Sequence, residues 1–290
     1  MKKFIYSILI LLALCSCDSV NNFLPNYDVV GMVYGQSPRN DTRFEQSMAY
    51  NESHPYLTIN VSTDEYKVYF STDMHVDSTW RNLTKWSTLA QSDTDCEFAI
   101  ILGDVINAMN NYDHFLAGLA PLTKPYFVTV GNHDLYYGQW EQFQKIFGTS
   151  VYYFIAQTPK YKDLYMCLDS GDGTLGRKQM SWMKSELEKA SKAGYRHIIV
   201  FTHTHIFKRD SSQGHIGNYA LEETYEITDA LSKYGVDWYV SGHAHSRNIT
   251  DFKNVKYIIV DTLQDPVEEA AYMVATIGRE MQYQFIRIKE

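Results

Sequence analysis

Short apolar runs alternate with longer segments of helical period over most of the chain, from residue 67 onward. Such runs predict strands at residues 67–72, 98–103, 126–131, 164–169, 197–202, 238–242, 256–261 and 282–288. Apolar residues at steps of three and four predict helices at residues 78–91, 139–147, 176–193 and 222–234. Strands that alternate with helices indicate βαβ units, and therefore an α/β fold with a largely parallel sheet covered by helices.

The N-terminus has the pattern of a secretory signal. Lys2 and Lys3 precede an apolar run, residues 4–14, which is too short to span a bilayer comfortably. The sequence "LLALCSCDS" that follows resembles a bacterial lipoprotein signal, and Cys17 fits lipidation better than Cys15 because it follows a small residue. The alternative is a plain secretion signal. We expect a lipoprotein of the bacterial cell envelope, periplasmic or surface-facing, that a lipid on Cys17 anchors to the membrane.

Residues 17–65 lack a strong period and are rich in Pro, Asn and Ser. We predict a signal peptide over residues 1–16, a tether and N-terminal extension over 17–65, and one folded domain over 66–290. In the extension, the stretches 29–34 and 56–61 would add one or two strands to that domain.

The net charge limits the possible partners of the chain, and the cysteine content limits its possible disulfides. The chain has 290 residues, enough for a well-buried core, and a formal net charge of -8. This acidity argues against a nucleic-acid partner, although bound metal ions can still attract a small phosphate ester. In an oxidising compartment, Cys96 and Cys167 form either two buried thiols or one disulfide.

Polar side chains follow the predicted strands at the points where the strands end. These residues are Asp73, His75, Asp104, Asn132, His133, His203, His243 and His245. If the strands are parallel, all of them lie at one rim of the sheet, where ligands bind in open α/β folds. By contrast, Asp169 and Asp261 are interpreted as ordinary cap or turn residues.

The residue types at this rim indicate transition-metal chemistry. Apart from His133, two carboxylates, one amide and four imidazoles suit Mn, Fe or Zn better than Mg or Ca alone. Seven ligands exceed the usual share of one ion. Two ions that share a carboxylate would use them all, and two-metal sites catalyse displacement at phosphorus.

The same residues occur in five blocks: "DMH" (73–75), "GD" (103–104), "GNHD" (131–134), "TH" (202–203) and "GHAH" (242–245). In this order they resemble the calcineurin-like metallophosphoesterases, and the resemblance covers residue 66 to the C-terminus. It implies a four-layer αββα sandwich of two mixed sheets flanked by helices.

The resemblance also implies roles for the residues. Asp73, His75 and His245 would hold one metal ion. The other would be held by Asn132, His203 and His243. Asp104 would bridge the two divalent or mixed-valence ions together with a hydroxide that attacks phosphorus. His133 would contact the phosphoryl oxygen or protonate the leaving group.

Two positions depart from the family pattern. Many relatives have an acidic residue where Asn107 stands, paired with the equivalent of His133, so Asp134 is an alternative partner for this histidine. Purple acid phosphatases place a metal-binding tyrosine at that position, and Asn107 therefore argues against an Fe(III)–tyrosinate centre. His205 stands where relatives often have proline, and it either contacts substrate or has no role.

The sequence therefore predicts a hydrolase of small phosphomonoesters or phosphodiesters. The alternative is a weakly active or inactive envelope binding module that retains the fold. Because all seven predicted ligands are present, the enzyme is the favoured interpretation.

Overall fold

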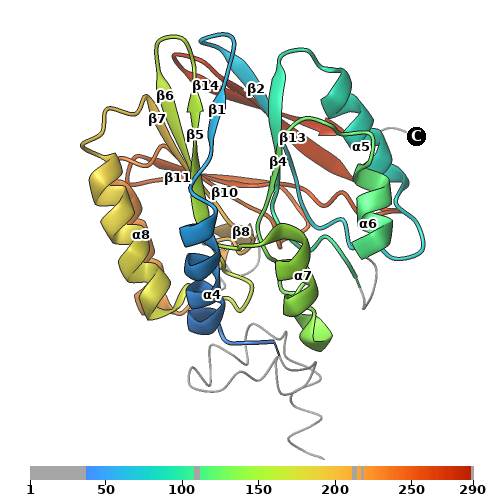
Figure 1. Ribbon diagram of the computed structural model, residues 1–290, viewed down its shortest axis with the longest axis horizontal. Coiled ribbons are helices and arrows are strands. Elements are labelled where there is room, and N and C mark those ends of the chain that lie inside the picture. The colour runs from blue at the N-terminus through green and yellow to red at the C-terminus, as the bar shows by residue number, and fades with distance from the viewer. Residues whose placement is uncertain (1–36, 108–111, 211–213, 217–218, 289–290) are drawn as a thin grey trace, which may run out of the picture.

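The structure is a computed structural model that describes residues 37–107, 112–210, 214–216 and 219–288. Two mixed β-sheets pack face to face, and helices cover their outer faces (Figure 1). This arrangement confirms the predicted four-layer αββα sandwich. The predicted signal peptide (residues 1–16), Cys17 and the stretch 29–34 lie outside the described residues.

The larger sheet has the strand order β1-β5-β6-β7-β10-β12-β11. The strands are β1 (Thr58–Asn60), β5 (Tyr152–Gln157), β6 (Lys162–Cys167), β7 (His197–Phe201), β10 (Trp238–Ser241), β11 (Asn248–Phe252) and β12 (Val255–Ile259). Strands β6, β7, β10 and β12 are parallel neighbours, whereas β5 pairs antiparallel with β6, and β11 pairs antiparallel with β12. The parallel strands therefore end at one edge of the sheet.

The smaller sheet has the order β14-β13-β2-β3-β4. Its strands are β2 (Tyr66–Ser71), β3 (Cys96–Ile101), β4 (Tyr126–Val128), β13 (Ala271–Ile277) and β14 (Met281–Arg287). Strands β2, β3 and β4 run parallel, and β13 runs antiparallel to both of its neighbours. A separate hairpin joins β8 (Lys208–Asp210) to β9 (Gly214–Ile216).

Helices α4 (Asn40–Ser53), α8 (Gly176–Ala190) and α9 (Leu221–Lys233) lie on the side of the larger sheet. Helices α5 (Arg81–Ser92), α6 (Tyr112–Leu119) and α7 (Trp140–Phe147) lie on the side of the smaller one. Figure 1 shows α4 and α8 on the left and α5, α6 and α7 on the right. No helix in these described ranges is long and apolar enough to cross a membrane.

The central strands are buried on both faces because the other sheet covers one side and helices cover the other. On β2, Val68 and Phe70 face the core between the sheets, and Tyr69 faces the helices beside Trp86 of α5. This explains why the sequence shows continuous apolar runs instead of strict alternation.

Several elements were not predicted. The sequence reading missed β5, β11, β13, α6 and above all α4, whose buried positions are Asn40, Arg43, Phe44 and Ser47. Three of these four side chains are polar, so the helix has no apolar stripe. The predicted strand at 56–61 is present as β1, which pairs in parallel with β5.

The two described cysteines are free, buried thiols. Cys96 begins β3 in the smaller sheet, and Cys167 ends β6 in the larger one. Of the two alternatives drawn from the sequence, the structure therefore has the thiols and not the disulfide. Burial raises the pKa of Cys96 to about 11, which keeps this thiol protonated and unreactive at neutral pH.

Candidate metal centre

The loops after five parallel strands bring all seven predicted ligands to one edge of the sandwich. Strands β2, β3 and β4 of the smaller sheet and β7 and β10 of the larger sheet end there. Their side chains form clusters of carboxylates and imidazoles whose donor atoms lie within 4.8 Å of one another.

The first cluster consists of Asp73, His75 and His245. Nε2 of His75 lies 3.0 Å from Nε2 of His245. Oδ1 of Asp73 lies 3.2 Å from Nε2 of His245 and 3.8 Å from Nε2 of His75. Asp73 and His75 are buried, whereas the His245 side chain is 45% exposed, so this cluster is open to solvent on one side.

The second cluster consists of Asn132, His203 and His243. Oδ1 of Asn132 lies 3.0 Å from Nε2 of His203 and 3.0 Å from Nδ1 of His243, and these two nitrogens are 3.1 Å apart. Nδ1 of His203 is 2.8 Å from the carbonyl of Leu102. If Nδ1 carries the proton for that bond, the neutral ring presents a lone pair to an amide oxygen. A cation between them removes this repulsion, so the residues fit a metal ion.

Asp104 lies between the two clusters. Its Oδ2 is 3.7 Å from Nε2 of His75 and 3.4 Å from Nε2 of His203. Its Oδ1 accepts the backbone N–H of His133 at 2.8 Å. One oxygen is thus fixed by the protein and the other faces both clusters. A Cβ on Gly131 would lie 2.2 Å from Oδ1, so this close approach requires glycine.

The backbone around the clusters is strained. Five of the seven predicted ligands have left-handed conformations: Asp73 (φ 50°), His75 (43°), Asp104 (51°), His243 (66°) and His245 (54°). Elsewhere in the described residues, only Tyr137, Lys253 and Asn254 share this conformation among non-glycines. Such conformations concentrate at functional sites because the surrounding structure must impose them.

The pKa values of His75 and His203 are shifted in opposite directions. Burial lowers the pKa of His75 to about 4, so its ring is neutral and available as a ligand. Burial acts in the same direction on His203, but the Asp104 carboxylate beside it raises the pKa of His203 to about 10. A cation that binds there would displace this proton, because a ligating imidazole must be neutral.

His133 lies at the junction of the clusters. Its ring centroid is 4.4 Å from that of His75, with the planes at 79°, and 4.7 Å from that of Tyr136. A ring nitrogen of His133 also lies within 4.8 Å of donor atoms of His75 and Asp104. The side chain can therefore reach a group held between the clusters. His205 is buried beside them, with its ring centroid 5.7 Å from that of His243.

Asp134 supports the backbone and does not pair with His133. Its carboxylate accepts the backbone N–H groups of Gly131 at 2.8 Å, Asp104 at 2.9 Å and Val105 at 3.1 Å. It thereby clamps the loop after β4 to the loop after β3. The Asn107 side chain is exposed at the surface.

Tyr136 is a site residue that the sequence reading missed. Its hydroxyl accepts a hydrogen bond from Nδ2 of Asn132 at 2.9 Å, which turns Oδ1 of this amide toward His203 and His243. In the sequence, the signal for this role was that Tyr136 follows Asn132 by four residues.

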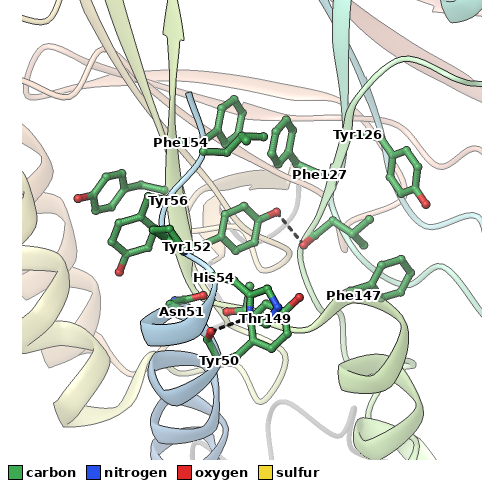
Figure 2. Close-up of a pocket in the computed structure, with 14 residues that line it drawn as sticks. Tyr50, Asn51, His54, Tyr56, Tyr126, Phe127, Phe147, Thr149, Tyr152 and Phe154 are labelled. Carbon is green, nitrogen blue, oxygen red and sulfur yellow. Dashed lines mark hydrogen bonds between the residues drawn. The ribbon is translucent and has the colours of Figure 1, made fainter. Parts of the chain in front are cut away.

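A separate cavity of about 290 Å³ lies between α4, β4 and β5. Figure 2 shows its aromatic lining, in which the hydroxyl of Tyr152 donates to the carbonyl of Val128 at 3.0 Å. None of its lining residues belongs to the two clusters. The cavity is therefore distinct from the candidate metal centre.

The sandwich and the clusters at its edge define a class of α/β proteins with a candidate centre for divalent metals. A family model described as calcineurin-like phosphoesterase matches residues 66–247. Because this match covers more than half of the chain, the protein belongs to the calcineurin-like phosphoesterase family. The comparison with curated proteins found no match.

Solved structures share the fold at low identity. The purple acid phosphatase PPD1 from yellow lupin (Lupinus luteus) seeds has a TM-score of 0.62 and 13% identity, over 78% of this chain and 52% of that one. GAP50, the anchor in the inner membrane complex of Plasmodium, has a TM-score of 0.59 and 14% identity, over 78% of this chain and 85% of that one. Family membership supports a hydrolase that binds divalent metal ions.

We predict that Tyr136→Phe weakens metal binding, because the amide of Asn132 is then free to rotate its oxygen away. Loss of such an outer partner typically costs about 10–100-fold in metal affinity. Titration calorimetry with Mn²⁺ measures the effect, and Tyr137→Phe, at an exposed neighbouring position, is the matched control. Equal affinities for the two variants would contradict the assigned role.

Proposed function

We propose that the protein is a binuclear metal-dependent phosphoesterase. The observation that carries this proposal is the position of Oδ2 of Asp104, which faces His75 at 3.7 Å and His203 at 3.4 Å. Asp73, His75 and His245 would hold one ion, and Asn132, His203 and His243 the other. The mixed oxygen and nitrogen set favours Mn, Fe or Zn.

Two divalent ions would supply an acidified water and neutralise charge on a phosphoryl group. The chain's own residues prepare the site for them. The backbone N–H of His133 and the side chain of Asp134 hold Asp104 and its loop in place, so that the shared oxygen cannot turn away. Thr72 Oγ1 and the N–H of His243 fix Oδ2 of Asp73 at 2.7 and 2.8 Å, which leaves Oδ1 to the cluster.

His133 is proposed as the catalytic side chain. Its ring lies against His75 at the junction of the clusters, where it can contact a phosphoryl oxygen or give a proton to the leaving oxygen. His205 is buried beside His243, where it is proposed to contact the substrate. The substrate class proposed is a small phosphomonoester or phosphodiester.

A binding module without catalysis is the second candidate. It is favoured by one observation, the fold shared with GAP50, the anchor in the inner membrane complex of Plasmodium. The convergence of all seven predicted ligands supports the enzyme instead, because a scaffold has no need to retain strained backbone at five of these positions.

Asp104→Asn tests the proposal, because an amide oxygen carries no charge and does not neutralise two cations. We expect kcat/KM for chromogenic phosphomonoesters and diesters, with Mn²⁺ or Zn²⁺ added, to fall by more than ~100-fold, the upper range for loss of an outer partner. Asp229→Asn, on the exposed face of α9, is the control and should retain full activity. Equal rates for wild type and Asp104→Asn would support the binding module.

His133→Gln separates catalysis from metal binding. If His133 acts on the substrate, kcat should fall by about 10²–10⁴-fold, the usual contribution of a general acid or base. The bound metal, measured by elemental analysis, should stay at the wild-type level. A variant that loses metal and activity together would instead make His133 a ligand.

The envelope location is proposed from the sequence alone. Cys17 is proposed as the lipidated residue that anchors the chain, with the catalytic domain beyond the tether. In a bacterial expression host given a labelled fatty acid, Cys17→Ser should abolish label incorporation, and Cys15→Ser should retain it. Label on the Cys17→Ser chain would refute the assignment.

A further inference from the structure

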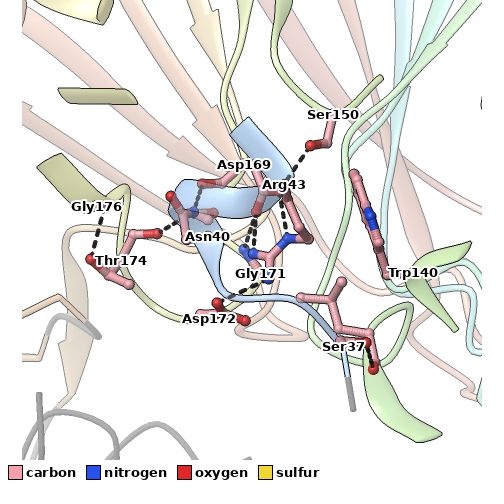
Figure 3. A network of polar contacts seen from close by, with 12 residues as sticks. Ser37, Asn40, Arg43, Trp140, Ser150, Asp169, Gly171, Asp172, Thr174 and Gly176 are labelled. Atoms are coloured by element: carbon pink, nitrogen blue, oxygen red, sulfur yellow. Dashed lines mark hydrogen bonds and ion pairs between the residues drawn. The ribbon is translucent and has the colours of Figure 1, made fainter. Parts of the chain in front are cut away.

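Helix α4 precedes residues 66–247, which the family model matches. Its residue Arg43 is nevertheless fully buried in the domain. Nε and Nη2 of Arg43 donate to Oδ2 and Oδ1 of Asp169 at 2.9 and 2.8 Å (Figure 3). Nη1 donates to Asp172 at 3.0 Å and to the carbonyl of Pro38 at 2.6 Å. The planar guanidinium thus joins α4 to the loop after β6, in a geometry that lysine cannot reproduce.

Asp169 was interpreted from the sequence as a cap or turn residue; it makes the turn contact, with Gly171 two residues on, but its carboxylate also has partners far away in the sequence. Besides Arg43, its carboxylate accepts the hydroxyl of Ser150 at 2.8 Å and the N–H of Gly171 at 3.2 Å. Its carbonyl accepts Nδ2 of Asn40, also on α4, at 3.0 Å. Buried ion pairs of this kind contribute little net stability, but they define one arrangement of the groups around them.

The next residue connects this loop to the second cluster. Oγ of Ser170 lies 2.6 Å from Oγ1 of Thr202 and accepts the backbone N–H of Thr204 at 2.8 Å. The Ser170 carbonyl accepts Oγ1 of Thr204 at 2.7 Å. Thr202 and Thr204 flank His203, so three hydrogen bonds between these threonines and Ser170 hold the segment that carries this ligand.

The same loop also packs against the segment that carries Asn132. A Cβ on Gly171 would lie 2.7 Å from Cδ1 of Leu135 and 3.2 Å from the carbonyl of Gly131, so the two backbones are in close contact. Ser37, which precedes α4, donates its hydroxyl to the carbonyl of Leu135. Both Asn132 and His203 therefore depend on contacts that lead back to α4.

The first cluster has further support that does not lead back to α4. The carbonyl of Asp73 accepts Oγ1 of Thr262 at 2.7 Å, and the N–H of Leu263 donates to Thr72 at 3.0 Å. These partners follow β12 and lie in the C-terminal part of the chain. Disturbance of α4 should therefore reach the second cluster before the first.

We propose that Arg43 is a positioning residue of the cluster formed by Asn132, His203 and His243. Through Asp169 and Ser170, helix α4 holds the loops that carry Asn132 and His203 at metal-binding distance. The inference rests on the proposed binuclear centre and assigns to the N-terminal extension a part in building it.

The test is Arg43→Lys in the full chain, with Mn²⁺ titrated calorimetrically into metal-free protein. We expect wild type to bind two equivalents. The variant should keep one of them unchanged and bind the other about 10–100-fold more weakly, as for loss of an outer partner. Low-temperature EPR gives a second readout, because isolated Mn²⁺ ions replace spin-coupled pairs when one site empties.

Arg196→Lys is the matched control. Arg196 forms a similar two-pronged pair with buried Asp163, with Nε 2.9 Å from Oδ1, at the opposite ends of β6 and β7. Its loss should leave both Mn²⁺ affinities unchanged. If Arg43→Lys fails to fold, the double variant Arg43→Met with Asp169→Asn removes both charges together and should show the same selective loss.

The inference is overturned if Arg43→Lys binds two Mn²⁺ as tightly as wild type, or if it weakens both sites equally. These outcomes are separate from those that bear on the proposed function. A wild-type chain that binds two Mn²⁺ but hydrolyses no ester would overturn the function and leave the role of Arg43 intact. If wild type is active and the Arg43→Lys variant binds both ions as tightly, the role of Arg43 is overturned and the proposed function stands.

Discussion

The candidate metal centre depends on one carboxylate oxygen, Oδ2 of Asp104, that faces imidazoles from both sheets. Asp104 follows β3 of the smaller sheet, whereas His203 follows β7 of the larger one. This contact exists only while the two sheets keep their relative position. The apolar layer between them, with Phe70, Phe98 and Phe154 fully buried, maintains that position. The core of the sandwich thus sets the geometry of the site at its edge.

The same core supports the strain at the site. Each left-handed non-glycine residue costs about 1–3 kcal/mol, and five of them occur among the seven predicted ligands. Short polar contacts compensate locally: Asp134 binds three backbone N–H groups, and Thr72 and His243 bind Asp73. Such a site is selected for the direction in which its side chains point, at the expense of local backbone preference.

The sequence predicts the strands and the residues at their ends because both leave a local signal. Apolar runs mark the buried strands, and polar residues after each run mark the common edge. The helix at Asn40–Ser53 left no such signal, because Asn40, Arg43 and Ser47 occupy its buried face. Hydrophobic periodicity finds a helix only where burial is apolar. The role of Tyr136 and the ion pair of Asp169 with Arg43 were missed for a related reason: both depend on partners that only the folded chain brings together.

Helix α4 shows why a polar contact can serve where an apolar one would not. An apolar side chain at position 43 would fill the space beside Trp140, whose ring centroid lies 5.7 Å from Cζ of the arginine. It would not hold the loop after β6 in one position, because dispersion contacts lack direction. The paired hydrogen bonds between Arg43 and Asp169 do hold the loop in one position, since both weaken when it moves. Ser170 is the next residue and bonds to Thr202 and Thr204, so the fixed position of the loop also fixes His203 between them.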